Sequence, residues 1–235
     1  MFIIELKEIS KNLFKITENR NIGAISEEEQ AVLGSKTVFV AGCGGLGCYC
    51  ADMLSRLGVG HLVLCDCDEF EPSNINRQLY CNVKTMGKNK AVVASQQINQ
   101  QRLSKVITYP TPITKLNAYD IIQNCDLVID CLDNIPTRFI LQKACEKRGI
   151  PMVTGGVSHW HGQVSVIFPG DNTMDKIFGE STTEQHPPVL GFVASTIASC
   201  EVAEAAKTLL GEPTLRNKLL IIDLKFFSAK ILPLD

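Results

Sequence analysis

The stretch from Thr37 to Arg77 decides the fold, and it reads TVFVAGCGGLGCYCADMLSRLGVGHLVLCDCDEFEPSNINR. An apolar run ends in the glycine-rich segment GCGGLG, a helical pattern follows, and a second apolar run ends on Asp66. This order is typical of a nucleotide-binding βαβ unit. Glycines let the backbone turn sharply and approach phosphate oxygens, and the helix N-terminus offers them N–H groups. We therefore predict a nucleotide site in which Asp66 accepts a hydrogen bond from the ribose.

Three charged residues after this unit indicate which nucleotide binds. Arg77 and Lys90 follow the second strand, and Asp133 follows a third apolar run. A triphosphate with Mg²⁺ needs cations for the charge on the leaving pyrophosphate and an acid for the metal. A hydride-transfer pocket has little use for either. Each residue alone would be interpreted as a solvated surface charge, but together they favour ATP and Mg²⁺ over NAD.

The alternation of strand and helix patterns predicts an α/β fold with a Rossmann-like, doubly wound, mostly parallel sheet. The alternation ends after about residue 155, and antiparallel additions are expected in the C-terminal part. Strands are predicted near 37–42, 61–66, 106–110, 126–131, 151–155 and 163–168. Helices are predicted near 45–58, 87–101, 116–124, 135–148 and 190–210, and 218–234 is strand-rich.

Composition limits the classes of protein that need to be considered. The 235 residues are 45% hydrophobic, enough for the core of one domain, and the net charge of −2 shows no basic stripe for nucleic acid. No apolar run approaches the roughly 20 residues of a membrane span. Ten cysteines without a signal-peptide pattern favour a reducing cytoplasm. We expect a cytoplasmic protein that binds neither membrane nor nucleic acid.

At this level of detail the sequence resembles the ThiF/MoeB/HesA family, the bacterial relatives of the ubiquitin-activating enzymes. The resemblance covers about residues 20–168 and 188–211, and its motifs are GCGGLG, LCDCDEFEPSNINRQ, MGKNKA, DLVIDCLDN and PMVTGGVSHWHGQV. It implies an ATP- and Mg²⁺-dependent adenylyltransferase. The expected substrate is the C-terminal Gly-Gly carboxylate of a small ubiquitin-like, ThiS/MoaD-like carrier, activated for sulfur transfer in thiamine, molybdopterin or related biosynthesis.

The resemblance also implies roles for individual residues. The expected catalytic residues are Arg77, Lys90 and Asp133, with Asp133 as the Mg²⁺ ligand. The expected nucleotide-binding residues are Gly42, Gly44, Gly45, Gly47, Asp66, Asn74, Gln78, Asn134 and Arg20. Arg20 falls where the family sends an arginine into the neighbouring subunit's ATP site, so a homodimer is expected.

The resemblance further suggests how the chain is divided. We interpret residues 1–235 as a single ThiF-type nucleotide-binding domain. Its expected parts are an N-terminal arm over 1–35, a Rossmann-like core over 36–156, and antiparallel strands, a crossover loop and a dimer helix over 157–235. The small residues Ala194, Ser195, Ala198 and Ser199 on that helix suit either a dimer interface or packing within the chain.

The cysteines depart from the family pattern. Many members carry two Cys-x-x-Cys pairs that bind zinc, whereas this chain has no such spacing, and no cysteine lies between Cys145 and Cys200. We therefore expect a short form without structural zinc. The crossover loop, residues 170–188, also lacks a thiol, so a partner's sulfur donor or an external amine must take the activated group. Most cysteines suit core packing, including Cys43, although a helix N-terminus nearby would favour its thiolate.

Adenylation explains the absence of a nucleophile–base motif. A C-terminal carboxyl ionises near pKa ~3.5, so at neutral pH it attacks without a general base.

His159 and His161 flank Trp160, the only tryptophan. We interpret these histidines as shaping the pocket edge that receives the acceptor's tail rather than as metal ligands.

Three alternatives to the carrier-activating enzyme remain open from the sequence. In the first alternative, the adenylated group is a non-protein carboxylate, as in related cyclases that act on a modified tRNA base. In the second, the chain is an NAD-binding oxidoreductase, a different class of enzyme. In the third, it is a nucleotide-binding scaffold that has lost catalysis. ATP–pyrophosphate exchange with candidate carboxylates separates these hypotheses.

Overall fold

The computed structural model describes residues 20–101, 103–179 and 187–234. Part of the predicted N-terminal arm and part of the crossover loop therefore lie outside the described residues. The sequence Ser26-Glu27-Glu28-Glu29 forms a capping box, because Ser26 Oγ accepts a hydrogen bond from Glu29 N–H and the Glu29 carboxylate accepts one from Ser26 N–H. It begins the first described helix, α2 (Glu27–Ser35).

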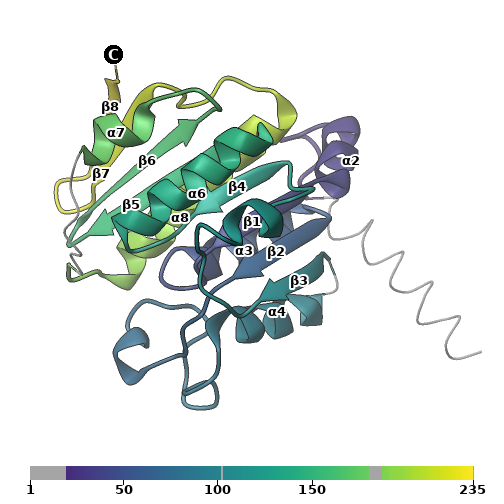
Figure 1. Ribbon diagram of the computed structural model, residues 1–235, viewed down its shortest axis with the longest axis vertical. Helices are drawn as coiled ribbons and strands as arrows, with labels where there is room; N and C mark the ends of the chain where they lie inside the picture. The colour runs from purple at the N-terminus through teal and green to yellow at the C-terminus, as the bar shows by residue number, and fades with distance from the viewer. Residues whose placement is uncertain (1–19, 102, 180–186, 235) are drawn as a thin grey trace, which may run out of the picture.

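The described strands form one eight-stranded sheet in the order β3-β2-β1-β4-β5-β6-β7-β8 (Figure 1). The first five strands in sequence pair in parallel, and β5–β6, β6–β7 and β7–β8 pair antiparallel. This confirms the predicted fold class. The strands are β1 (Thr37–Ala41), β2 (His61–Cys65), β3 (Lys105–Tyr109), β4 (Leu127–Asp130), β5 (Met152–Ser158), β6 (His161–Ile167), β7 (Lys218–Asp223) and β8 (Ser228–Pro233).

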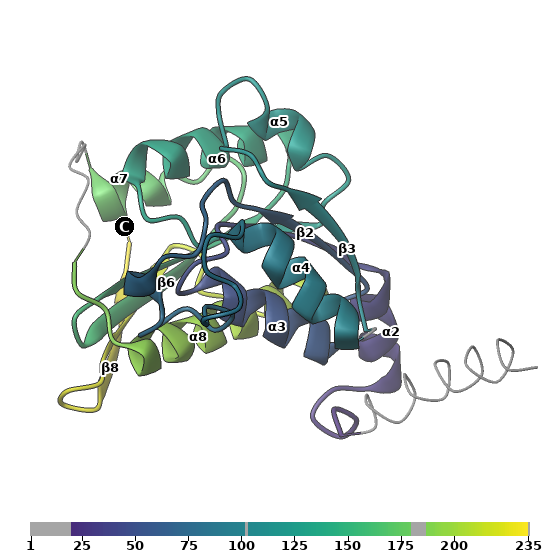
Figure 2. The same ribbon diagram turned by 90° about the horizontal axis from the view of Figure 1, so that it is seen from below.

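Helices cover both faces of the sheet (Figure 2). One face carries α3 (Gly47–Leu57), α4 (Lys90–Gln101) and α8 (Gly191–Leu210). The other carries α5 (Ala118–Ile121), α6 (Ile135–Arg148) and α7 (Thr173–Phe178), and a short 3₁₀ helix, η1, spans Pro72–Asn74. Because β1 and β4 are enclosed on both faces, their side chains are almost all apolar and buried, as expected for parallel strands.

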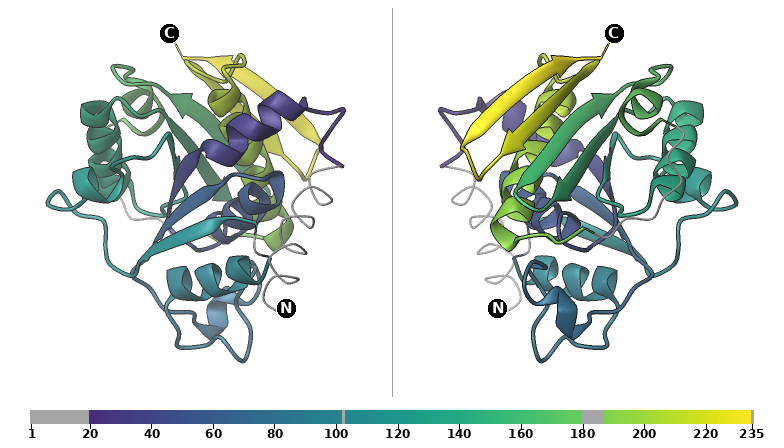
Figure 3. Two further views of the ribbon diagram at one scale, coloured as in Figure 1. Left: turned by 90° about the vertical axis from the view of Figure 1, so that its right-hand side faces the viewer. Right: turned by 90° about the vertical axis from the view of Figure 1, so that its left-hand side faces the viewer.

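The antiparallel part of the sheet is less enclosed. Helix α8 packs against β4, β5 and β6, so it spans the junction between the parallel and antiparallel halves. Strand β8 is exposed along its whole length and forms the edge of the sheet beside β7, as the yellow hairpin in Figure 3 shows. The parallel half thus holds the enclosed core, and the C-terminal hairpin extends it toward solvent.

Two predicted helices are shorter in the structure. The helix expected from residue 87 begins at Lys90, because Gly87 has a positive φ of 69° and the Asn89 side chain caps the helix by accepting from Val92 N–H. The helix expected over 116–124 is a single turn, and Asn124, with φ of 65°, follows it in a left-handed conformation.

The close approach of α3 to the glycine loop yields a stability prediction. A Cβ at Gly47 would overlap the carbonyl oxygen of Gly42, whereas a Cβ at Gly34 in α2 would meet nothing closer than 3.9 Å. We expect Gly47→Ala to lower stability by about 2–3 kcal/mol. The matched Gly34→Ala should raise it by about 0.5–1 kcal/mol, because alanine is the better helix former. Thermal unfolding of both variants measures this, and equal melting temperatures would contradict it.

Candidate functional site

A cavity of about 660 Å³ lies where the parallel strands end. The loops after β1, β2, β3 and β4 line it, together with residues of β5 and β6. Ligands of open α/β sheets bind at this edge. Nine of the residues predicted from the sequence line the cavity, namely Gly42, Gly44, Gly45, Asp66, Arg77, Gln78, Lys90, Asp133 and Asn134. Four separate motifs therefore converge on one site.

Three predicted residues do not line the cavity. Gly47 is buried beneath the loop and acts through its close packing on Gly42. Asn74 is buried in η1, where its side-chain oxygen accepts a hydrogen bond from Glu71 N–H. Arg20 is exposed and precedes α2. Within a single chain, Gly47 and Asn74 thus shape the loops around the cavity, and Arg20 lies outside its lining.

The glycine loop is held close to the loop that follows β4. Gly42 has φ of 85°, and a Cβ there would come within 2.9 Å of the Cys131 carbonyl oxygen, so only glycine suits this position. Gln78 lies beside Gly44, and its side-chain oxygen is buried without a hydrogen-bond partner among the described residues. An unpaired buried acceptor costs free energy, so this site suits a ligand that donates to it.

Asp66 is fixed by two backbone hydrogen bonds. Its Oδ2 accepts from Cys43 N–H at 2.7 Å, and its Oδ1 accepts from Asp68 N–H at 2.8 Å. Burial raises the pKa of Asp66, although these hydrogen bonds act in the opposite direction. A carboxylate oxygen has a second lone pair, so Asp66 retains capacity to accept a hydroxyl group.

Lys90 is a buried cation among acids. Its Nζ lies 3.0 Å from Asp68 Oδ2, and the residue is 8% exposed. Burial lowers the pKa of Lys90, but the charges of Asp66, Asp68 and Asp133 outweigh burial and the net pKa is raised. Lys90 therefore keeps its charge inside the cavity, in a field to which Asp133 contributes.

Arg77 and Asn134 are held by local contacts. The Arg77 guanidinium donates to the Ser73 carbonyl oxygen at 2.9 Å and to Asn76 Oδ1 at 2.8 Å. Asn134 Oδ1 accepts from Thr137 N–H at 2.9 Å and so caps α6. This cap fixes the start of α6 directly after Asp133, which is itself exposed at the cavity.

Sequence reasoning missed Arg138, a third cation that lines the cavity. It is 5% exposed, and its guanidinium donates to Asp130 Oδ2 at 2.7 Å, Thr154 Oγ1 at 2.9 Å and the Gly155 carbonyl oxygen at 2.8 Å. A further hydrogen bond reaches the Leu132 carbonyl oxygen. The available signal was Asp130, a charged residue that ends an apolar strand and requires a buried partner.

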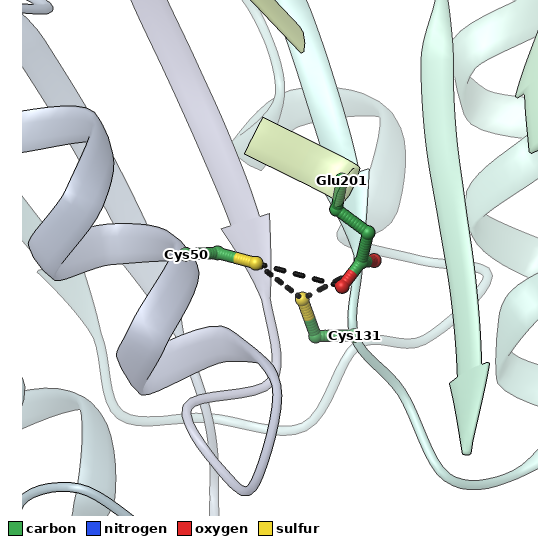
Figure 4. Close-up of side chains that lie close together, drawn as sticks. All are labelled: Cys50, Cys131 and Glu201. Atoms are coloured by element: carbon green, nitrogen blue, oxygen red, sulfur yellow. Dashed lines mark hydrogen bonds between the residues drawn. The ribbon is translucent and has the colours of Figure 1, made fainter. Parts of the chain in front are cut away.

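Behind the cavity, two thiols and a carboxyl form a buried cluster (Figure 4). Cys50 Sγ lies 3.8 Å from Cys131 Sγ and 3.5 Å from Glu201 Oε2. Burial raises the pKa of Glu201 to about 8, and it raises the pKa of both thiols as well. With these raised pKa values the three groups hold their protons at neutral pH and contact one another by hydrogen bonds. Of the described residues, Asp66, Cys67 and Asp68 form the other group of potential metal ligands.

Cys43 follows the packing interpretation. It is fully buried, and burial raises the pKa of its thiol well above the ordinary value. The helix N-terminus nearby does not offset the loss of water around the sulfur. Cys43 therefore stays a neutral thiol in the core beneath the glycine loop.

With this geometry in place, comparison with known proteins identifies the chain as a member of the ThiF family, whose model matches residues 18–235. This confirms the resemblance drawn from the sequence motifs. In the part of the chain that the structure describes, no helix combines the length and the apolar character that crossing a bilayer requires.

Two curated relatives illustrate the similarity. The adenylyltransferase and sulfurtransferase MOCS3 of Dictyostelium discoideum is 36% identical over 208 residues, which cover 83% of this chain and 48% of that protein. The SAMP-activating enzyme E1 of Haloferax volcanii is 31% identical over 217 residues, covering 89% of this chain and 80% of that enzyme. The chain thus spans about half the length of the MOCS3 relative.

Solved structures agree with the fold. E. coli MccB with succinimide superposes with a TM-score of 0.77 at 20% identity, and MccB with ATP with a TM-score of 0.74 at 21% identity. Both matches cover 88% of this chain and 65% of MccB. At this level of identity, the match supports the fold and carries no statement about substrate.

The raised pKa of Glu201 yields a prediction about pH and stability. The folded state holds the Glu201 proton up to about pH 8, whereas the carboxyl of an unfolded glutamate ionises at its ordinary pKa of 4.5. The folded state therefore binds more protons between these values, and stability falls as pH rises through this window. The neutral, isosteric variant Glu201→Gln has no such pH-dependent loss of stability. Its melting temperature minus that of the wild type should therefore increase as pH rises from about 5 to 9.

The control is Glu212→Gln, which replaces an exposed glutamate. Its melting temperature should differ from the wild type by the same small amount at every pH. Parallel curves for Glu201→Gln and the wild type would show that Glu201 ionises in the folded state as readily as in the unfolded state.

Proposed function

We propose that the protein is an ATP- and Mg²⁺-dependent adenylyltransferase that activates the C-terminal Gly-Gly carboxylate of a small ubiquitin-like carrier protein. One observation carries the proposal, namely that the glycine loop, the cations Arg77, Lys90 and Arg138, and the acid Asp133 line the same cavity. This combination suits a triphosphate more than a dinucleotide, whose reacting ring carries no such charge. The names of the two curated relatives point to the same reaction.

The residues present fit a magnesium-bound nucleoside triphosphate. A volume of about 660 Å³ falls in the range of small-molecule sites. The unpartnered Gln78 oxygen can accept a hydrogen bond, Asp66 can hold the ribose, and a Cβ at Gly42 would clash where the backbone turns. We assign Asp133 as the ligand of Mg²⁺, which would neutralise charge on the phosphate oxygens.

The residues of the chain would act by position and charge. The carrier carboxylate is ionised at neutral pH and needs orientation rather than a base. The glycine-loop N–H groups and α3 N-terminus would bind phosphate oxygens, and Lys90 and Arg77 would stabilise charge as pyrophosphate leaves. Lys90 suits this role because its raised pKa keeps it charged.

The carrier and the pathway are the finer part of the proposal. The relative from Haloferax volcanii is named for activating SAMP proteins, and MOCS3 is named both an adenylyltransferase and a sulfurtransferase. These names support a ubiquitin-like carrier that receives sulfur, as in thiamine or molybdopterin biosynthesis. ATP–pyrophosphate exchange with candidate carboxylates identifies the substrate. Stimulation by a Gly-Gly-ended protein supports the proposal, whereas stimulation only by a small carboxylate, or ATP binding without exchange, would replace it.

The sharpest test of the site is Asp133→Asn. This change removes one charge at constant size, so the fold should persist while Mg²⁺-dependent ATP–pyrophosphate exchange falls by a factor on the order of 10² or more. The control is Asp120→Asn, whose carboxylate is 74% exposed and pairs only with Arg148 among the interactions found in the described residues. Near-normal exchange by Asp133→Asn would remove Asp133 from the proposed mechanism.

A homodimer with shared sites belongs to the same proposal, and it now depends on Arg20. Ala194 and Ala198 are fully buried within the chain, where α8 packs on α3 and β5. The small-residue stripe of α8 is therefore largely explained by packing in one chain. Arg20 is exposed outside the lining of its own cavity, as a residue that reaches a partner's site would be.

Mixing inactive chains tests this arrangement. If each subunit lends Arg20 to the other, a heterodimer of Arg20→Ala and Asp133→Asn chains contains one site free of both changes. After subunit exchange, an equal mixture should recover about a quarter of normal exchange activity, since half of the dimers are mixed and each has one intact site. A monomeric protein, or an inactive mixture after verified subunit exchange, would exclude the shared site.

A further inference from the structure

The β5–β6 hairpin brings a histidine to the cavity. His159 and Trp160 form the turn, and His161 opposes Ser158 where the two strands begin to pair. His161 lines the cavity together with Ser158 and Gly162, whereas His159 faces a second, smaller pocket. The sequence predicted that both histidines shape the pocket edge, but only His161 lines the cavity, and His159 in the turn is not among its lining residues.

Strand β7 supplies His161 with a carboxylate partner. Asp223 opposes His161 in the antiparallel register, and Asp223 Oδ2 lies 3.1 Å from His161 Nε2. The other oxygen, Oδ1, accepts from the backbone N–H groups of Lys225 at 2.8 Å and Phe226 at 3.2 Å. The Asp223 side chain is 18% exposed. The turn after β7 thus fixes the carboxylate that orients the imidazole.

This arrangement selects one tautomer of neutral His161. A carboxylate only accepts hydrogen bonds, so Nε2 carries the proton and Nδ1 keeps a lone pair. No hydrogen bond to Nδ1 is found within the described residues. A base whose second nitrogen is held by a carboxylate is the arrangement that activates nucleophiles in many transferases and hydrolases.

Two carboxylates and the thiols of the cavity are already engaged or hold their protons. Asp66 is hydrogen-bonded to two backbone N–H groups, and Asp68 pairs with Lys90. Burial raises the pKa of Cys65 to about 12, and it also raises the pKa values of Cys131 and Cys67, so these three groups stay thiols. These thiols therefore offer no thiolate to attack an activated carboxyl group, and the acceptor must come from outside.

We propose that His161 is the general base of the acyl-transfer step, acting on an acceptor that arrives with an N–H or S–H proton. The proposal rests on the proposed adenylation. The nucleophile's nitrogen or sulfur bonds to the carbonyl carbon of the acyl adenylate, and its proton goes to His161 Nδ1. The bond between that carbon and the phosphate oxygen breaks, and AMP leaves with the electron pair. Asp223 is a positioning residue that holds the imidazole through Nε2.

The first experiment compares two half-reactions in the same enzyme preparation. ATP–pyrophosphate exchange reports adenylate formation on a Gly-Gly-ended carrier, and product formation with glycinamide or a simple alkyl thiol reports acyl transfer. His161→Gln should lower the ratio of transfer to exchange by a factor on the order of 10², as expected for loss of a general base. With hydrosulfide at mildly alkaline pH, which is already ionised, the ratio should stay at the wild-type value.

His159→Asn is the matched control. His159 has φ of 54°, which asparagine tolerates, and its Nδ1 contacts Ser158 Oγ at 2.9 Å rather than the cavity. Its ratio should equal that of the wild type. Equal loss for His159→Asn and His161→Gln would mean that the hairpin acts only through its shape, and equal loss with hydrosulfide would exclude proton transfer.

The second experiment needs no nucleotide. In the ligand-free protein, which has four histidines, the ¹⁵N chemical shifts of the rings distinguish the two tautomers. His161 should be the Nε2–H form, and Asp223→Asn should shift it toward Nδ1–H, because the amide can donate to Nε2. The same variant should lose acyl transfer with glycinamide by a similar factor. A wild-type Nδ1–H tautomer would overturn the proposal.

The outcomes separate this inference from the function on which it rests. Wild-type protein that shows no exchange with any carrier would overturn both. Normal exchange together with an unchanged transfer ratio in His161→Gln would overturn the role of His161 and leave adenylation standing. A thiol-specific effect would identify a sulfur donor as the acceptor, and an amine-specific effect would identify an amine; either result supports the base.

Discussion

The buried ion pair between Arg138 and Asp130 holds together the parts of the site. Asp130 ends β4 and is fully buried, so its charge needs the guanidinium that α6 returns to it. The same guanidinium binds carbonyl oxygens of the loop after β4 and of Gly155 in β5. A buried pair of this kind adds little net stability, but loss of one partner is costly. The main effect of this pair is on geometry. Asp133 lies in the segment between Asp130 and Arg138, so the pair fixes both ends of the segment that carries it.

Pairing of this kind also explains why acids and cations can share one cavity. The charges of Asp66, Asp68 and Asp133 keep Lys90 protonated. The Arg138 guanidinium donates to the buried carboxylate of Asp130. Glu201 is the exception, since burial and the charge of Asp130 favour its neutral form. The cavity is therefore lined by fixed charges, whereas Glu201 and the two thiols beside it are neutral. Charges held in place before a ligand arrives need no reorganisation when the ligand binds.

The sequence predicted the parts of this site that local patterns carry. The glycine loop, Asp66 and Asp133 each follow an apolar strand, so strand prediction places them at one edge of the sheet. Lys90 begins α4 and reaches the same edge from the segment after β2. Arg138 and Glu201 were missed because helical residues look like surface charges until the sheet packs on them. Asp223 meets His161 only through the antiparallel register. The length of α5 was wrong for a different reason, since a left-handed asparagine follows its single turn.

The position of β1 in the sheet has a consequence for synthesis of the protein. Strand β1 lies between β2 and β4, and its pairing with β4 joins Val38 to Leu127. The glycine loop gains its close contact with Cys131 only through this pairing. On the ribosome, the first βαβ unit therefore emerges well before the segment that completes its binding edge. Until β4 arrives, one side of β1 is an open edge with unpaired backbone groups, which can pair with a strand of another chain.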